Sequence, residues 1–303
     1  MQGLATFIMR GRSQAALVAS VAAVLSLMVP LVGLISSAVV ALVTMRQGST
    51  EGLVVGCFAG LTSGLFAFAA LGSPLPAIGF ALALWLPVWV LGVVLRNTRS
   101  LSLSIQLASL IGLIIVLALR LGSEDPTLYW AAILEPIRES LVQGQVFKEE
   151  GSHEMVAEIA RWMTGAFATT FYFQAVLALF LGRWWQSQLY NPGGFGKEFR
   201  ELRLSKGVGA LGVVLLLVLM VRSESPWAAD LLLLITPLLF LQGLAIAHFV
   251  VAALNAGRGW LIGMYALLVL VMPYGEILIA GLGLGDIWMD VRAKVPVRDR
   301  DTH

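Results

Sequence analysis

The chain has 303 residues, of which 58% are hydrophobic and only 13% are charged, and its mean hydropathy is +0.87. Soluble domains are roughly 45–50% apolar and about 25% charged, so this composition excludes an ordinary soluble protein. The single cysteine, Cys57, excludes an intrachain disulfide framework and a cysteine metal site. The sequence therefore predicts an all-α, polytopic transmembrane helical bundle that forms one integral membrane domain, residues 1–303.

The first apolar run, residues 13–45, follows Arg10 and Arg12. This arrangement resembles a secretory signal, but the apolar run continues without an A-x-A cleavage site, so we expect a retained first span. The run is too long for one helix of about 20 residues and is interrupted by Pro30. A tight hairpin with arms at 13–28 and 31–45 is the better interpretation.

The third expected span, residues 52–71, has a glycine at every fourth position, and these glycines are predicted to form a packing face. They are Gly52, Gly56, Gly60 and Gly64. Two interpretations stay open. The face packs inside the bundle, with the first span and its Ala15, Ala19 and Ala23 as a weaker partner pattern, or it docks another membrane subunit.

The middle of the chain is expected to alternate spans with two polar segments. Residues 122–161 form a polar excursion with amphipathic pieces, which is typical of an external segment lying in the membrane interface. Residues 183–206 are predicted to form a cytoplasmic loop with an amphipathic helix, and residues 291–303 a cytoplasmic tail. Pro237 is expected to kink one span, and Pro273 to break the last pair. The remaining spans are predicted at 75–95, 101–121, 164–182, 207–221, 228–254, 259–272 and 275–290.

These boundaries give about ten membrane segments, including short hairpins at both termini. The number of membrane segments decides on which side each loop lies, and cytoplasmic loops hold the excess of Lys and Arg, so the distribution of positive charge tests this number. Fifteen of the 20 basic residues fall on one side of the ten-span arrangement, which places both termini in the cytoplasm. The five on the other side are Arg120, Arg138, Lys148, Arg161 and Arg222.

The last apolar stretch is interpreted as the only span that carries carboxylates inside it. At 100° per residue, Glu276, Asp286 and Asp290 fall on one stripe. An ionised carboxylate in hydrocarbon costs on the order of 2.5–3.5 kcal/mol, so this stripe should face the bundle or a wet cavity. The two aspartates are either boundary anchors paired with Arg258, Arg292 or Lys294, or part of a pocket.

Gln242, His248 and Asn255 are polar residues in or just after the otherwise apolar span 228–254. Two interpretations stay open for each residue: it forms an interhelical hydrogen bond, or it lines a functional pocket. Together with Glu276, Asp286 and Asp290 they are the candidate ligand pocket. The chain has no H-E-x-x-H or G-x-S-x-G motif and no donor cluster, so we expect no enzyme activity, catalytic residue, metal, cofactor or nucleic-acid partner.

Three segments resemble a known family. They are Leu241 to Phe249, the Asn191-Pro192-Gly193-Gly194-Phe195 turn with Phe199 to Leu204, and the closing Gly285 to Arg292. They are similar to the YybS-type family of bacterial multi-pass membrane proteins, a domain of unknown function. The resemblance implies a bacterial cytoplasmic (inner) membrane protein, distantly similar to the S-components of energy-coupling-factor transporters.

The leading functional hypothesis is a non-catalytic membrane protein that binds a small molecule, as a transport component or a sensor. The alternative is a membrane scaffold or assembly factor that acts through helix–helix contacts. The expected partners are the lipid bilayer, a small-molecule ligand and another membrane subunit at the Gly52–Gly64 face. The two hypotheses differ in whether Gln242, His248 and the acidic stripe converge on one cavity.

Overall fold

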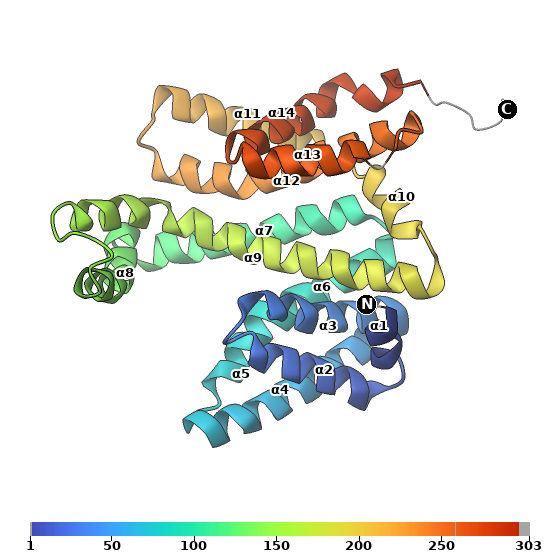
Figure 1. The fold of residues 1–303 in the computed structure, drawn as a ribbon, viewed down its shortest axis with the longest axis horizontal. Helices are drawn as coiled ribbons and strands as arrows, with labels where there is room; N and C mark the ends of the chain where they lie inside the picture. Colours follow the sequence, from blue (N-terminus) through green and yellow to red (C-terminus); the bar gives the residue numbers. More distant parts are fainter. Residues whose placement is uncertain (1, 258, 297–303) are drawn as a thin grey trace.

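The structure of the protein is a computed structural model that describes residues 2–257 and 259–296. Within those two ranges every regular element is helical and no β-strand occurs, which confirms the predicted all-α fold. Figure 1 shows the helices in three stacked layers, which follow one another in chain order.

The first layer contains the N-terminal third of the chain. Its helices are α1 (Gln2–Ile8), α2 (Arg12–Leu25), α3 (Gly33–Gln47), α4 (Ser49–Leu71), α5 (Leu75–Phe80) and α6 (Leu86–Thr98). The predicted hairpin is present, because a 3-10 turn, η1 (Pro30–Val32), separates α2 from α3. A π-helical turn, η2 (Ala81–Trp85), joins α5 to α6.

The middle layer contains α7 (Leu101–Gly122), α8 (Pro126–Gln143) and α9 (Ser152–Tyr190). Side-chain caps set two of the helix starts: Ser100 accepts the Leu103 N–H, and Asp125 accepts two N–H groups of α8. The 39-residue α9 differs from the expectation, because it absorbs both the amphipathic piece near 155–163 and the start of the predicted loop 183–206. No proline interrupts this stretch, so the helix continues through its polar first turns.

The third layer contains the C-terminal third. Its helices are α11 (Lys206–Val221), α12 (Pro226–Ala253), α13 (Gly259–Leu270) and α14 (Tyr274–Met289), and the short α10 (Gly194–Arg200) connects it to the middle layer. A 3-10 turn, η3 (Val291–Lys294), follows α14. Pro273 lies in the break between α13 and α14, as predicted, and Pro237 lies inside the continuous helix α12.

α9 holds the layers together through small residues. At Gly182 a Cβ atom would lie 2.8 Å from the Ala41 Cβ of α3, and at Gly165 it would lie 2.8 Å from the Asp230 Cα of α12. Each glycine therefore lets a neighbouring backbone approach closely, as is common between membrane helices. Between these two contacts, Tyr172 and Leu179 are fully buried in the main hydrophobic core.

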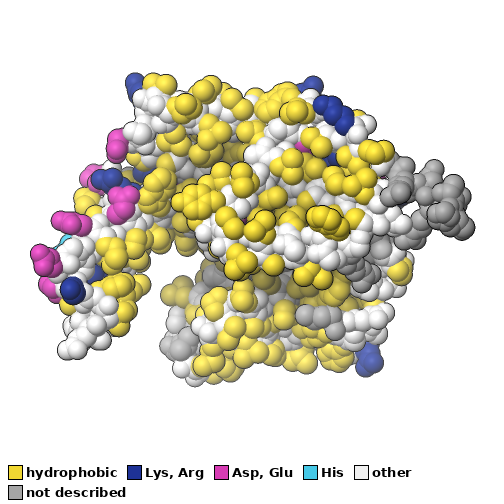
Figure 2. Space-filling model, turned by 45° about the horizontal axis from the view of Figure 1, so that its top comes forward, with side chains coloured by type: hydrophobic (Ala, Val, Ile, Leu, Met, Phe, Trp, Pro, Cys, Tyr) yellow, Lys and Arg dark blue, Asp and Glu magenta, His cyan; other side chains and the backbone are white. Residues whose placement is uncertain are grey.

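Much of the outer surface is apolar (Figure 2). By length and hydropathy, six of the described helical segments can cross a membrane: Pro30–Gln47, Ser49–Ala70, Leu75–Thr98, Leu101–Gly122, Ser152–Tyr190 and Pro226–Ala253. Shorter apolar helices are Arg12–Leu25, Lys206–Val221 and Gly259–Leu270. The described chain therefore has the features of a multi-pass membrane protein.

Candidate functional site

Gln242 and Asp286, two of the six predicted pocket residues, are buried side by side between α12 and α14. The Gln242 Nε2 atom donates to Asp286 Oδ2 over 3.2 Å and to the Gly283 carbonyl oxygen over 3.1 Å. The helices approach this closely because Gly243 and Gly283 lie at their contact. A Cβ atom on either glycine would lie 2.0 Å from a carbonyl oxygen of the opposite helix.

Gln242 and Asp286 also accept hydrogen bonds from two further segments, the loop after α10 and the start of η3. The Leu204 N–H donates to Gln242 Oε1 over 2.7 Å, and the first N–H of η3 donates to Asp286 Oδ1 over 2.9 Å. Arg292 is also buried; its Nη2 atom lies 3.6 Å from Asp286 Oδ2 and donates to the Leu202 carbonyl oxygen over 2.7 Å. These polar groups form a packed joint between α12, α14 and the loop after α10.

The other four predicted pocket residues lie elsewhere. The His248 Nε2 atom is 2.8 Å from a tyrosine hydroxyl of α13, and Asn255 follows the end of α12 with φ of 50°. Glu276 lies in the first turn of α14, whereas Asp290 ends that helix and lies 3.1 Å from an arginine of the loop after α10. Because α14 ends at Met289, the helical stripe does not extend to Asp290. Arg258, a predicted partner of the acids, lies outside the described residues.

The four glycines of α4 do not form one continuous contact. A Cβ atom at Gly52 would lie 1.8 Å from the Thr44 Oγ1 of α3, whereas at Gly60 and Gly64 the nearest atoms would be 3.6 and 3.4 Å away. Nothing lies within 4 Å of a Cβ at Gly56. Gly56, Gly60 and Gly64 each lie one position after a buried residue of α4, which turns them about 100° away from the buried face. The buried face of α4 is Gly52, Val55, Ala59, Ser63 and Ala67.

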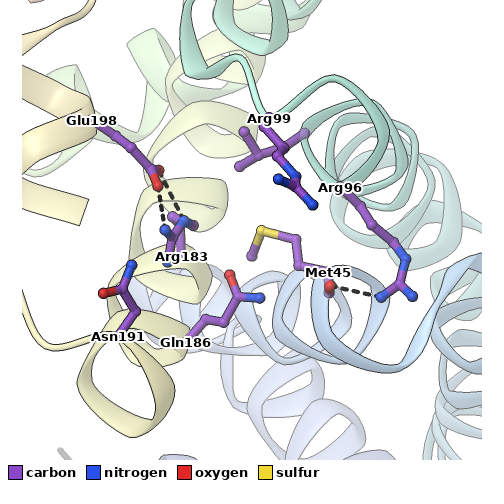
Figure 3. Close-up of a pocket in the computed structure, with 8 residues that line it drawn as sticks. Met45, Arg96, Arg99, Arg183, Gln186, Asn191 and Glu198 are labelled. Atoms are coloured by element: carbon purple, nitrogen blue, oxygen red, sulfur yellow. Dashed lines mark hydrogen bonds and ion pairs between the residues drawn. The ribbon is translucent and has the colours of Figure 1, made fainter. Parts of the chain in front are cut away.

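A polar cavity of about 460 Å³ lies at the end of the bundle where α3, α6 and α9 finish (Figure 3). α3 and α6 supply one side of the cavity, and α9 with α10 supplies the other. The lining residues are Met45, Leu95, Arg96, Arg99, Arg183, Gln186, Asn191 and Glu198. We call this cavity the arginine pocket.

The three arginines of the arginine pocket are held differently. Arg183, which is mostly buried, makes a two-bond ion pair with Glu198, in which Nε donates to Oε2 over 2.9 Å. Arg96 donates from Nη1 to the Met45 carbonyl oxygen over 2.8 Å. The Arg99 guanidinium makes neither a hydrogen bond nor an ion pair with any described residue, and Figure 3 shows it directed into the space between Arg96 and Arg183.

The backbone at Arg99 is unusual for an arginine. This residue ends α6 in the left-handed conformation, with φ of 54° and ψ of 23°. Glycine or asparagine is the usual residue at such a position, and another side chain costs roughly 1–2 kcal/mol there. The turn alone does not explain the presence of an arginine.

The sequence interpretation missed the arginine pocket, because it used Arg96, Arg99 and Arg183 only as evidence for the cytoplasmic side of the membrane. They are far apart along the chain, and they meet because the C-terminal part of α9 packs across α3 and α6. A short signal was present in Arg96 and Arg99 themselves, which lie three residues apart at the end of one helix.

A buried ion pair that the sequence interpretation missed joins the middle and third layers. The Arg120 Nε atom of α7 lies 2.6 Å from Asp230 Oδ2 of α12, and the Gly165 N–H of α9 donates to Asp230 Oδ1 over 2.9 Å. The exposed fractions of the two side chains are 8% and 1%. The interpretation that only the last span carries carboxylates was therefore wrong, since Asp230 lies inside α12, a candidate span.

A charged corner lies where α8 turns into α9, at the opposite end of the molecule from the arginine pocket. Arg138 Nη2 is 2.8 Å from Glu135 Oε1, and its Nη1 donates to Ser152 Oγ over 2.9 Å and to Glu149 over 3.3 Å. His153 lies 4.0 Å from the same Glu135 oxygen. The hydrogen bond from Arg138 lowers the pKa of Glu135, with a further contribution from the positive charge of Arg138, against a raising effect of burial.

Comparison with known proteins places the chain in a family but not in a functional class. The model of a family described as "Predicted membrane protein (DUF2232)" matches residues 17–287, which is most of the chain. No curated protein and no solved structure matches the chain. The matched range contains the glycine contact between α12 and α14, the buried Arg120–Asp230 pair and the whole arginine pocket. The chain therefore belongs to DUF2232, a family of predicted membrane proteins.

Proposed function

We propose that this protein is a non-catalytic membrane protein that binds a small polar ligand in the arginine pocket, as a transport component or a sensor. The observation that carries the proposal is a cavity of about 460 Å³ with an unengaged guanidinium directed into it. Ligand sites are typically cavities of about this size with a few convergent polar groups. Around Gln242 and Asp286 the two helices are in close contact at Gly243 and Gly283, so we move the proposed site from the predicted pocket to the arginine pocket.

The distribution of charge supports a cytoplasmic opening for the arginine pocket. We propose ten membrane crossings, formed by α2, α3, α4, α5–α6, α7, α9, α11, α12, α13 and α14. The N-terminal helix and η3 lie at the same end of the molecule as the pocket (Figure 1). That end carries most of the basic residues, so the positive-inside rule favours the cytoplasmic side of a bacterial inner membrane. The corner between α8 and α9 would then be external.

The proposal agrees with the resemblance to the YybS-type family and, more distantly, to the S-components of energy-coupling-factor transporters. We propose a binding protein rather than an enzyme, because the H-E-x-x-H and G-x-S-x-G motifs of metal and hydrolytic chemistry do not occur in the sequence.

The test uses the purified full-length chain in a non-ionic detergent and a panel of polar cytoplasmic metabolites, with the thermal unfolding midpoint as the readout. A ligand that binds only the folded protein raises that midpoint. Gln186→Phe places a large apolar ring in the arginine pocket, and Gln188→Phe, two residues along the same helix and exposed, is the matched control.

A compound that stabilises the wild type and Gln188→Phe but not Gln186→Phe supports the proposal. If every stabilising compound acts equally on both variants, or no compound stabilises the wild type, the pocket is not a ligand site. The scaffold alternative then becomes the better interpretation, and it predicts a partner subunit that co-purifies with both variants.

A further inference from the structure

We propose that the ligand of the arginine pocket is an anion with a phosphoryl group, and that Arg99 is the residue that binds the phosphoryl oxygens. This inference rests on the proposed function of the pocket as a ligand site. It adds the chemical class of the ligand and the side chain that selects it.

The balance of charge in the pocket favours an anion. Three guanidinium groups and one carboxylate line it, and the carboxylate of Glu198 is already engaged by Arg183. Arg99 has no partner among the described residues, and the amides of Gln186 and Asn191 make no side-chain hydrogen bond to them either. The open part of the cavity therefore offers donors from several directions and no unengaged anionic acceptor.

Helix electrostatics explain only part of this cluster. The pocket lies at the C-terminal ends of α3, α6 and α9, where the partial negative charge of each helix attracts cations. Arg96 meets this need directly, because it donates to a carbonyl oxygen in the last turn of α3, and Arg183 is neutralised by Glu198. Arg99 does neither. It also occupies a left-handed position that glycine or asparagine would adopt with less strain.

The number and direction of the donors favour a phosphoryl group over a carboxylate. A phosphoryl group presents three acceptor oxygens, and arginine binds two of them in a planar, two-bond geometry. Arg99 can supply that fork, while Gln186 and the remaining N–H groups of Arg96 and Arg183 surround the same space (Figure 3). A carboxylate, with two oxygens on one side, would leave part of this donor set unused.

The cavity of about 460 Å³ has room for a phosphoryl group with a further group attached. Two sources supply this chemistry at the end of a membrane bundle: a soluble phosphate ester and the headgroup of an anionic phospholipid. The experiment therefore includes one arm for each source.

The first arm measures thermal unfolding of the full-length chain against inorganic phosphate and sn-glycerol 3-phosphate, with acetate and chloride at equal ionic strength. We expect stabilisation by the two phosphoryl compounds and none by acetate or chloride. Arg99→Gly should weaken the affinity for the phosphoryl compounds by about tenfold or more, which is the usual effect of a lost charged hydrogen bond. Arg46→Gln, the same loss of charge at the same end but outside the pocket lining, should keep the wild-type affinity.

The unfolding midpoint of Arg99→Gly without ligand separates a ligand-binding arginine from a structural one, because loss of a structural arginine would lower that midpoint. Because glycine suits the left-handed position, Arg99→Gly should unfold at or above the wild-type midpoint while its phosphate affinity falls. Arg99→Asn, which also tolerates this conformation, repeats the test if the glycine variant expresses poorly.

The second arm reconstitutes the protein in vesicles of phosphatidylglycerol and counts retained lipids by native mass spectrometry. If the wild type retains lipid that Arg99→Gly loses, and sn-glycerol 3-phosphate does not displace this lipid, the ligand is a lipid headgroup. Displacement assigns a soluble ester, and both results support the phosphoryl class.

Equal stabilisation by acetate and phosphate, or an equal loss in Arg46→Gln and Arg99→Gly, overturns the inference. If a compound without phosphate is the pocket-dependent ligand, this inference fails while the proposed function stands. If nothing binds in a way that Gln186→Phe abolishes, both fail.

Discussion

Replacing Gly243 or Gly283 with alanine should destabilise the protein more than any other single methyl addition on α12 or α14. The Cβ of either alanine would lie 2.0 Å from a carbonyl oxygen of the opposite helix, whereas ordinary contacts begin at 3.4 Å. The helices must therefore separate locally by about 1.4 Å, the difference between these two distances. Overpacking of this kind costs about 1–3 kcal/mol.

The separation would also break the hydrogen bonds beside the contact. Gln242 donates over 3.2 Å to Asp286 and over 3.1 Å to the Gly283 carbonyl, and an added ångström exceeds hydrogen-bonding distance for both. Each lost bond costs about 0.5–1.5 kcal/mol. The combined loss of unfolding free energy, for the overpacking and the two hydrogen bonds together, is therefore about 2–6 kcal/mol.

The assay is unfolding of the full-length chain in mixed micelles by a denaturing detergent, followed by tryptophan fluorescence. Gly56→Ala is the matched control, because no atom lies within 4 Å of its new methyl group and alanine is the better helix former. The control should be at least as stable as the wild type. If Gly283→Ala and Gly56→Ala unfold at the same detergent fraction, the close contact of α12 and α14 is wrong.

Three further predictions concern charged groups. Asp230→Asn leaves Arg120 buried without its partner and should lower the unfolding free energy by about 3–5 kcal/mol in the same assay, whereas a change of only a few tenths would mean that the pair is hydrated. Asp286→Asn should cost a similar amount, about 3–5 kcal/mol, because it strands a buried arginine; a fully stable variant would instead identify Asp286 as a boundary anchor. The lowered pKa of Glu135 means that its bond to Arg138 contributes stability above the unfolded-state pKa and loses it as pH falls through the folded-state pKa. The protection factor of the amides at the start of α9, which corrects for the slower intrinsic exchange in acid, should therefore fall in the wild type as the pH drops below the unfolded-state Glu pKa of about 4.3. A difference from Glu135→Gln that does not change with pH would contradict this.

Local rules predicted much of the helical layout. Pro30 and Pro273 separate helices where the sequence indicated breaks, and the alternation of apolar runs with polar segments located most of the helices. The length of α9 was not predictable in this way, because polar residues near 155–163 end an apolar run without ending a helix. Hydropathy measures the environment of a helix, whereas its boundaries depend on caps and prolines.

The site was less predictable, because its residues come from separate helices. The contact of Gln242 with Asp286 was within reach, since both are polar residues in apolar stretches that had to satisfy each other. The arginine pocket was not, because Arg99 and Arg183 each had a sufficient explanation as a charge at a membrane boundary. Only the packing of α9 against α6 brings them to one space.

The helix α9 is long enough to connect the two ends of the molecule. Thirty-nine residues at 1.5 Å each extend for about 58 Å, nearly twice the thickness of the hydrocarbon layer of a bilayer, about 30 Å. One end carries Ser152, which Arg138 holds at the charged corner, and the other carries Arg183 and Gln186 in the arginine pocket. With no proline to interrupt it, α9 is one continuous helix from the charged corner to the arginine pocket, so a single element spans the two ends of the protein.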